Sequence, residues 1–492
     1  MVFLQPVHSA VQDMPWGSKG STSLAGQLWL AGGHAQAQGH DALDEHQTYA
    51  ELWQAGTHEK GPSTLAIDSD DGKRGQPLSA VLRKRKHELL GENILQKMPW
   101  VDSDTHGGVP VLFKVLSAGK ALPLQAHPDA ELSRKLFESQ PGREDDEQVR
   151  YDGVHKPEIA LALTPFRGFI GFAPKEIIVQ RLEMLPELRD LFLARNVPVA
   201  VSKHLVQDMT DAYHELVDPH QRTHSPYSWH DKISAALGRL LGADKKRLGS
   251  VLKQILSRAE NKDAGEWAGP EGEQLRSLII ELNEQYPGDS GVLAAPVFMN
   301  LAALEPGECI YAPADTIHAW LSGDIIEAMP ASVNVHNTAF GPDPSVETLQ
   351  IFTKMLSYDA KPLSDFKIRP EPLEGTPKDT TTIYRIPLEE FDVVRVFLSS
   401  ASSSAPTCTV RLFTEEDGLG VLDGLGIVSV VRGKGRLHGF EPGSSAGSSR
   451  ITHEVGPGSV VVVGKGTAIE LERTAADNLE VYIAVCQPKT PA

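Results

Sequence analysis

Three segments of the sequence carry side chains that commonly bind metals. Gln125 and His127 are two residues apart, and in a β-strand such residues project from the same face. The segment 155–158 reads His-Lys-Pro-Glu and places Glu158 at the head of an apolar run, and His318 follows much later. Two imidazoles, one carboxylate and one amide oxygen form a plausible ligand set for zinc, with an open position for a substrate.

Spacing alone leaves this metal site undecided. The chain has 18 histidines, and any two of them are more often surface or hydrogen-bonded core residues than ligands. The candidate ligands are also far apart in the chain, so the fold must bring them together.

The segments that carry them lie in β-rich sequence. From about residue 15 to 172, apolar runs such as Val109–Leu116 and Ile159–Leu163 are separated by Gly, Pro and Asp, the pattern of strands joined by turns. The pattern returns after residue 288, where we expect strands at Cys309–Ala312 and Asp324–Met329, with Ser322-Gly323 as a divider. A further β region begins near residue 381.

Between about residues 174 and 286 the hydrophobic residues follow a helical period instead. The residues that recur at this spacing are Leu237, Leu240 and Leu241; Val251, Leu252, Ile255 and Leu256; and Leu275, Leu278, Ile279 and Leu282. The pattern predicts a helical block inserted into a β protein.

The expected fold is mainly β, with two jelly-roll (cupin-like) β-sandwich halves and an α-helical insertion domain. We expect residues 1–172 and 288–365 to form the metal-binding half, 173–287 the insertion, and 366–492 the C-terminal β domain. That last domain lacks a matching Gln-x-His and distant His, so we expect no second metal there.

Composition narrows the classes of partner. Lys and Arg total 47 and Asp and Glu total 65, so the formal net charge of −18 disfavours nucleic acid and anionic membrane surfaces. The three cysteines, Cys309, Cys408 and Cys486, form no CxxC pair and fit neither a disulfide scaffold nor a cysteine zinc site. The sequence has no signal-peptide pattern and no apolar run of about 20 residues. We expect a cytoplasmic monomer.

Longer blocks of the sequence resemble the type I mannose-6-phosphate isomerase family. The resemblance covers most of residues 14 to 357, and its motifs occur in the family's order. The matching blocks are Pro110–Asp129, His155–Glu158, Pro306–Glu308 and His318–Glu327, with weaker matches at Trp16-Gly17 and Tyr49–Ser63. The resemblance implies an enzyme of carbohydrate metabolism, serving GDP-mannose biosynthesis, that interconverts mannose 6-phosphate and fructose 6-phosphate.

Carried over by position, the resemblance implies one zinc ion per chain, held by Gln125, His127, Glu158 and His318. The resemblance implies that Glu327 and Lys156 are catalytic residues, with Glu327 in the place of an acid–base residue and Lys156 two residues before Glu158. It implies that Lys114 binds substrate. The family reaction passes through an enediol, so it needs an acid–base group near the reacting carbon and cations for a phosphate. The expected partner is therefore a small sugar phosphate.

Five positions depart from the family's pattern around the substrate. They are Pro123 (usually Ser), Ala130 (usually Lys), Val333 (usually Asp), Asn337 (usually an active-site Arg) and Asp343 (usually Lys). Asparagine can form a hydrogen bond but cannot neutralise a phosphate. No Arg occurs between His318 and Asp365, so a shift of the alignment does not restore the cation.

Three hypotheses follow from these residues. The first is a working mannose-6-phosphate isomerase, in which other groups replace the Arg lost at Asn337. The second is a zinc enzyme or binding protein for an unphosphorylated sugar. The third is a pseudoenzyme that keeps the metal for folding or sugar sensing.

Overall fold

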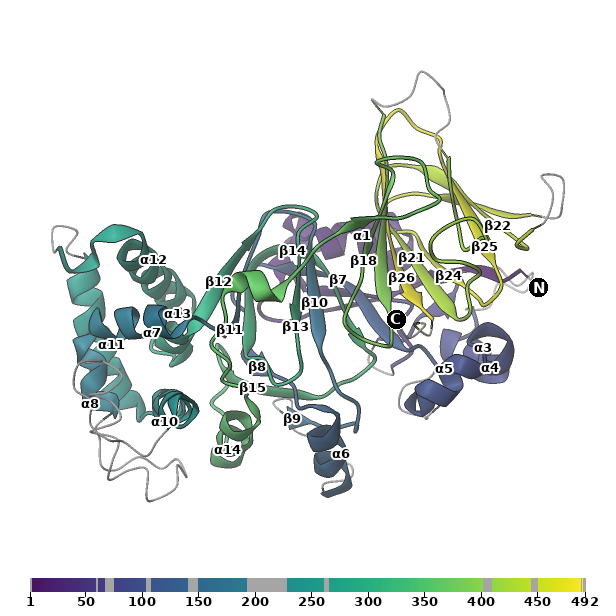
Figure 1. Ribbon diagram of the computed structural model, residues 1–492. Helices are drawn as coiled ribbons and strands as arrows, with labels where there is room; N and C mark the ends of the chain where they lie inside the picture. Colours follow the sequence, from purple (N-terminus) through teal and green to yellow (C-terminus); the bar gives the residue numbers. More distant parts are fainter. Residues whose placement is uncertain are drawn as a thin grey trace.

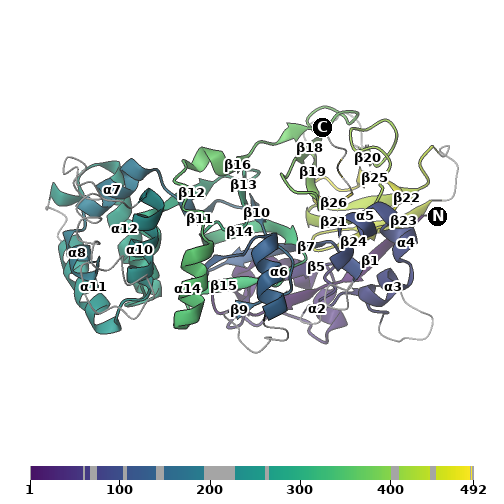
Figure 2. The ribbon, with the colours of Figure 1, turned by 60° about the horizontal axis from the view of Figure 1, so that its bottom comes forward.

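The computed structural model describes residues 2–58, 61–66, 75–102, 108–139, 149–192, 228–260, 265–400, 409–443, 450–487 and 489. A helical block lies at one end, the β domain with the predicted site lies in the middle, and a second β domain lies at the other end (Figures 1 and 2). The predicted mainly-β fold with a helical insertion is confirmed. The boundaries at residues 172, 287 and 365 stay predictions.

The middle β domain is organised around one long strand, β14 (His318–Pro330). Its second half pairs with β10 (Glu158–Ala162) on one side and β7 (Val111–Ala118) on the other. Its first half pairs with β11 (Phe166–Phe172) and, at His318, with β8 (Leu124–Ala126). The other strands of this sheet are β2 (Ala10–Gln12), β5 (Glu51–Gln54), β9 (Val149–Arg150), β12 (Met299–Leu304), β13 (Cys309–Ala312), β15 (Val335–Ala339) and β16 (Lys367–Ile368).

The sequence predicts that Ser322-Gly323 separates two strands, but β14 continues through both residues. Gly323 has a φ of +102°, in the region that favours glycine. A Cβ at this position would lie 2.5 Å from the carbonyl oxygen of Pro165. The glycine therefore marks the point at which one strand changes its pairing partners.

Strand β7 is buried at all of its positions, because both of its faces are covered. Val111, Phe113 and Val115 share a hydrophobic core with residues of the C-terminal domain such as Leu425 and Tyr482. The alternate face points into the β domain and carries Lys114. A strand that is buried on both faces usually has an uninterrupted apolar sequence, so Lys114 is an unusual residue for this strand.

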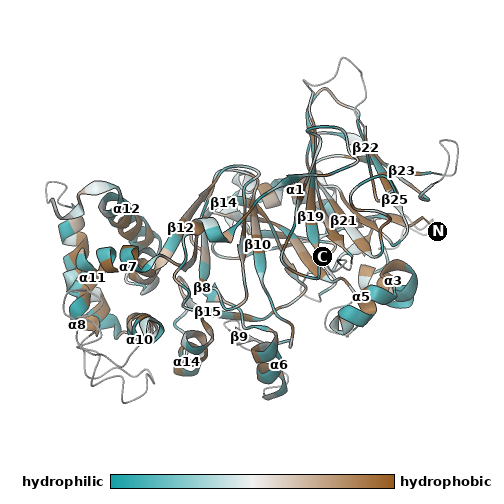
Figure 3. Ribbon diagram, viewed as in Figure 1, coloured by the Kyte–Doolittle hydropathy of each residue, from teal (hydrophilic) through white to brown (hydrophobic). Residues whose placement is uncertain are grey.

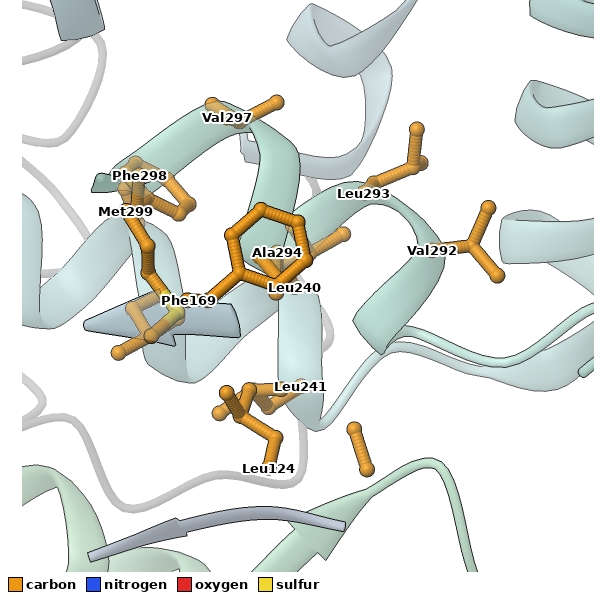
Figure 4. Close-up of a cluster of buried hydrophobic side chains, with 14 of the residues drawn as sticks. Leu124, Phe169, Leu240, Leu241, Val292, Leu293, Ala294, Val297, Phe298 and Met299 are labelled. Carbon is orange, nitrogen blue, oxygen red and sulfur yellow. The ribbon is translucent and has the colours of Figure 1, made fainter. Parts of the chain in front are cut away.

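The helical block forms around a shared apolar core. Its helices are α7 (Lys175–Glu183), α8 (Arg189–Phe192), α10 (Trp229–Leu241), α11 (Lys245–Glu260), α12 (Gly269–Gln285) and α13 (Gly291–Phe298). Helices α10, α11 and α12 each bury one side, and α13 is buried at every position. Helices α11 and α12 each have one hydrophobic side and one hydrophilic side (Figure 3). The residues predicted at helical spacing are buried or packed against the core of the block. This core continues into the middle domain, where Leu124 and Phe169 pack against Leu240 and Leu241 (Figure 4).

The C-terminal domain is a sandwich of two sheets around its own apolar core. The larger sheet has the order β17 (Glu371–Pro372), β18 (Thr381–Tyr384), β19 (Asp392–Leu398), β26 (Leu479–Cys486), β21 (Leu425–Arg432), β24 (Val460–Val463), β1 (Leu4–His8) and β6 (Thr64–Leu65). The smaller sheet has the order β20 (Thr409–Leu412), β25 (Ala468–Arg473), β22 (Gly435–Phe440) and β23 (Ile451–Val455). The N-terminal strand β1 thus completes the sheet of the last domain.

The remaining elements cover the edges of the β domains. They are β3 (Ser18–Lys19), β4 (Thr48–Tyr49), α1 (Leu24–Ala31), α2 (His34–Ala37), α3 (Leu78–Lys84), α4 (Lys86–Leu89), α5 (Glu92–Lys97), α6 (Ala130–Ser139) and α14 (Val346–Met355). Cys309 and Cys486 are buried free thiols, and Cys408 lies outside the described residues. Within the described part of the chain, no helix has the length and apolar character needed to cross a bilayer.

Candidate metal centre and acid–base cluster

Three of the four predicted ligands meet at the junction of β8, β10 and β14. Their ligand atoms, from His127, Glu158 and His318, all lie within 4.8 Å of one another. Nε2 of His127 is 3.2 Å from one oxygen of Glu158, and Nε2 of His318 is 3.2 Å from the other. Both nitrogens are buried and have no hydrogen-bond partner among the described residues. Such convergent, unpaired donors fit a metal ion.

The opposite ring nitrogens fix the tautomers of both histidines. Nδ1 of His127 lies 2.7 Å from the carbonyl oxygen of Asn334, and Nδ1 of His318 lies 2.8 Å from that of Thr316. A carbonyl oxygen can only accept, so Nδ1 carries the proton in each ring. Each Nε2 is then left with a free lone pair directed at the shared centre, as metal-binding histidines require.

Protonation states in the cluster also suit a metal. Burial lowers the pKa of His127 to about 3, and the positive charge of Lys156 acts in the same direction. Burial alone would raise the pKa of Glu158, but Lys156 and His127 hold it well below its usual range. A neutral imidazole and an ionised carboxylate are the forms that coordinate zinc.

The fourth predicted ligand, Gln125, lies beside His318. In the antiparallel pairing of the strands, Gln125 of β8 is directly opposite His318 of β14 and also opposite Asn337 of β15. Residues directly opposite each other in antiparallel strands face the same side of the sheet. Gln125 and Asn337 therefore share the face of His318. That Gln125 binds the metal stays a prediction.

A second buried cluster adjoins the first, built from β5, β7 and β14. Nζ of Lys114 lies 2.6 Å from Glu327 and 3.0 Å from Glu51. The indole of Trp320 donates to Glu327 at 2.6 Å, and that of Trp53 donates to Glu51 at 2.6 Å. Cross-strand register explains the arrangement, because Lys114 is directly opposite both Glu327 and Trp53.

Charges in this second cluster are strongly coupled. Burial raises the pKa of Glu327; Lys114 opposes this effect, while Glu158 and Glu51 add to it. Burial would lower the pKa of Lys114, but Glu327 and Glu51 raise it above its ordinary value. Lys114 is therefore a permanent cation, and Glu327 is a carboxyl group that can hold a proton more readily than an ordinary glutamate.

Lys156 links the metal centre to its surroundings. Its Nζ lies 2.9 Å from Oε1 of Glu158, and the side chain is largely buried. Both predicted cations, Lys114 and Lys156, thus lie in the site but are already paired with carboxylates. Their roles toward a substrate stay predictions.

The positions that depart from the family's pattern are dispersed in the structure. Asn337 lies at the site, and its Oδ1 is buried without a hydrogen-bond partner among the described residues. Asp343 lies at the surface, where it pairs with Lys245 of α11. Ala130 is exposed at the start of α6, whereas Pro123 and Val333 are half-buried. Only Asn337 is brought into register with a candidate ligand.

A small cleft with an internal volume of about 20 Å³, enough for about one water molecule, lies beside the second cluster. Its lining includes Trp53, Leu112, Asp152, Ser332 and Val333. Trp53 lines this cleft and donates a hydrogen bond to Glu51. Its side chain therefore separates the cleft from the acid–base cluster and contacts both. The volume of the cleft is far below the roughly 300–1,000 Å³ of small-molecule sites, so this cleft alone does not hold a sugar.

Sequence reasoning assigned no role to Glu51 or Trp320. Glu51 was visible only as part of a weak matching block, and Trp320 as a residue following His318. Their contacts with Lys114 and Glu327 depend on strand register, which neither spacing nor composition reveals. The signal that could have found Glu51 is its acidic side chain in an otherwise fully buried strand.

Comparisons with known proteins match most of the chain. Residues 4–175 match the family described as phosphomannose isomerase type I, catalytic domain, and residues 206–299 match its helical insertion domain. A mannose-6-phosphate isomerase of Cryptococcus neoformans is 32% identical over 97% of this chain and 98% of its own length. The mannose-6-phosphate isomerase of Homo sapiens is 29% identical over 98% of each chain.

Solved structures share the fold. A zinc-bound mannose 6-phosphate isomerase superimposes with a TM-score of 0.68 at 22% identity, covering 98% of this chain and 100% of that one. The apo form of the enzyme from Salmonella typhimurium gives a TM-score of 0.67, also at 22% identity, with 99% and 100% covered. With full-length matches in both sequence and fold, the chain belongs to the type I mannose-6-phosphate isomerase family.

Proposed function

We propose that this protein is a zinc-dependent isomerase that interconverts mannose 6-phosphate and fructose 6-phosphate. The observation that carries the proposal is the convergence of His127, Glu158 and His318, with a buried Glu327–Lys114 pair beside them. Membership of the family supports this reaction. The lowered pKa of His127 keeps its imidazole neutral, which is the form that binds zinc.

Gln125, His127, Glu158 and His318 would hold the zinc ion. When bound, zinc supplies electrophilic help by polarising substrate oxygens. The protein contributes the orientation of the ligands, since Asn334 and Thr316 fix the two imidazole rings through their carbonyl oxygens. Burial of His127, Glu158 and His318 keeps bulk water away from the centre.

Glu327 is the candidate for moving the proton between C1 and C2 of the sugar. Its raised pKa brings it closer to the working pH, which favours both uptake and release of a proton. Lys114 and the indole of Trp320 hold the carboxyl group from two sides, so its orientation is fixed before substrate arrives. Lys156, whose Nζ lies 2.9 Å from Oε1 of Glu158, is the candidate for contact with substrate oxygens near the metal.

The charge balance of the site supports an anionic substrate. Among the described residues the two clusters contain two ammonium groups, from Lys114 and Lys156, and three carboxylates, from Glu51, Glu158 and Glu327. A divalent cation turns this balance from negative to positive. The cation missing at Asn337 is thus partly offset by the metal and by protonation of Glu327.

A second candidate is an isomerase or binding protein for an unphosphorylated sugar. It is favoured by Asn337, whose amide provides hydrogen bonds but no charge. A pseudoenzyme that keeps the metal without turnover is the third possibility.

The test is an assay of zinc-loaded protein that follows fructose 6-phosphate formed from mannose 6-phosphate, with mannose as the parallel substrate. A Gln125→Ala/His127→Ala variant should lose both zinc and turnover, whereas His46→Ala, at an exposed histidine, should retain both. Turnover of mannose alone would favour the second candidate. One zinc per chain with turnover of neither sugar would leave only the non-catalytic role.

A further inference from the structure

The segment that delivers Lys156 to the site has no regular secondary structure. Residues 151–157 form neither helix nor strand, and β10 begins only at Glu158. Side-chain contacts hold its first half instead: the amide of Asp152 donates to Oδ1 of Asn334 at 2.7 Å, and Oγ of Ser332 donates to the carbonyl oxygen of Val154 at 3.0 Å. These partners belong to the middle domain.

The second half of the segment is held by the C-terminal domain. Nε2 of His155 lies 2.6 Å from Oε1 of Glu390, in the connection between β18 and β19. Glu390 is only 6% exposed, and its second oxygen has no hydrogen-bond partner among the described residues. The neighbouring thiol of Cys486 is buried and the phenol of Tyr311 is half-buried. Burial raises the pKa values of both groups, and the charge of Glu390 adds to this rise.

The connection that carries Glu390 is itself firmly held. The carboxylate of Asp392 accepts from the amide of Ile386 at 2.8 Å and pairs with Lys489 at 2.7 Å. These contacts hold the backbone of the short connection on both sides of Glu390. The carboxylate is therefore presented to His155 from a fixed backbone.

Docking of the two domains does not depend on the His155–Glu390 contact. The larger C-terminal sheet already packs on the middle domain through an apolar core that includes Val115, Ile326, Tyr384 and Leu425. Burying a carboxylate at such an interface costs free energy unless it is well paired. A buried Glu390 with a single described partner is thus poorly explained by domain packing alone.

Lys156 stands directly after His155 and before Pro157, whose ring restricts the preceding residue to extended backbone. With His155 tied to Glu390 and Glu158 fixed in β10, the backbone of Lys156 has little freedom. Its Nζ then reaches Oε1 of Glu158 at 2.9 Å. We propose that Glu390 is a positioning residue: through His155, the C-terminal domain sets the position of Lys156 beside the metal centre.

This inference rests on the proposed function for its effect on catalysis but not for its effect on the segment itself. The experiment compares Glu390→Ala, Glu390→Gln and His155→Ala, with Glu389→Ala as matched control. Glu389 is the adjacent, exposed residue and pairs with Lys97 at the surface. All are measured as zinc-loaded protein for kcat and KM with mannose 6-phosphate, for zinc content, and for hydrogen exchange of residues 151–158.

We expect Glu390→Ala to raise KM about tenfold with kcat within about twofold, because a displaced Lys156 binds substrate less well. Glu390→Gln can still accept a hydrogen bond from the imidazole and should restore most of the lost affinity. The Glu390→Ala/His155→Ala double variant should be no worse than either single variant, as expected for two residues that act as a unit. Hydrogen exchange of residues 151–158 should accelerate in the alanine variants, and zinc content should stay at one per chain.

Wild-type KM and unchanged hydrogen exchange in Glu390→Ala would overturn the inference. A lower kcat with unchanged KM that Glu390→Gln does not rescue would also overturn it, since a loss of folded protein produces that pattern. If the wild-type chain turns over no mannose 6-phosphate, the proposed function fails. The exchange measurement then decides the positioning role by itself.

Discussion

The pKa values of two glutamates in this site shift in opposite directions although both side chains are buried. Glu158 faces Lys156 and the two imidazoles, which hold its pKa well below the usual range. Glu327 must share Lys114 with Glu51, and its pKa is raised. Burial acts alike on both, so the difference comes from their partners. One carboxylate is suited to hold a metal and the other to exchange a proton.

At the residue scale, we expect Glu327→Gln to lower kcat by about 10²–10⁴-fold, the usual contribution of a general acid–base group. The amide can still accept the hydrogen bond from Trp320, so the fold and the zinc content should be unchanged. Steady-state kinetics and metal analysis of the purified variant measure both. Glu305→Gln, at an exposed position, serves as the control. A fall in kcat of less than tenfold would remove Glu327 from the proton transfer.

At the scale of elements, β14 decides how the two clusters meet. His318 stands in its first half and Glu327 in its second, and the strand changes partners between them at Gly323. Only glycine combines the positive φ with the close approach to Pro165. The bend thereby places a metal ligand and an acid–base residue from one strand in one site.

We therefore expect Gly323→Ala to destabilise the protein by about 1–3 kcal/mol or more, from backbone strain and the clash with Pro165. Gly249→Ala is the matched control, because Gly249 lies in α11 with nothing near its added Cβ. That control should stabilise the protein by up to about 1 kcal/mol. Denaturant unfolding of both variants gives the comparison, and equal effects at the two glycines would refute the role of the bend.

At the scale of the whole molecule, the two ends of the chain are joined. Strand β1 pairs with β24 of the C-terminal sheet, and His34 bridges the same two regions. Nδ1 of His34 accepts from the amide of Ser9 at 3.2 Å, while Nε2–H donates to the carbonyl oxygen of Gly458 at 2.8 Å. The imidazole must be neutral to make both bonds, since a protonated ring has no acceptor.

This bridge predicts a pH dependence of stability. Burial lowers the pKa of His34 to about 4, against the opposing effect of its bond to Gly458. The ordinary value is about 6.5, so between these two pH values the unfolded state binds the proton and the folded state does not. Neutral His34 therefore contributes about 3 kcal/mol to the free energy of unfolding above a pH of about 6.5. This contribution is lost as the pH falls toward about 4.

The free energy of unfolding, measured at several pH values from 7 to 4, checks this expectation. His34→Leu should be less stable at pH 7 but should show a shallower loss on acidification. His46→Leu, at an exposed position, should keep the wild-type pH profile. An unchanged slope in His34→Leu would show that other groups carry the acid sensitivity.

The sequence by itself determined the fold class and predicted the types of metal ligand. The helical period of residues such as Leu237 and Leu240, and the short apolar runs around Val460–Val463, depend on local side-chain spacing, which the chain displays directly. The Gln-x-His and His-Lys-Pro-Glu blocks are equally local, so their resemblance to a family could be recognised without a structure.

Only the tertiary structure decided which side chains meet. Glu51 joins Lys114 across 63 residues of sequence, and His155 joins Glu390 across 235. The sequence predicts a break between two strands at Gly323, but a single strand bends there and continues. Pairing with two sets of neighbouring strands outweighs the local turn signal. Strand register and domain packing fix these contacts through free energy gained between distant segments, and no local pattern of residues encodes such pairings.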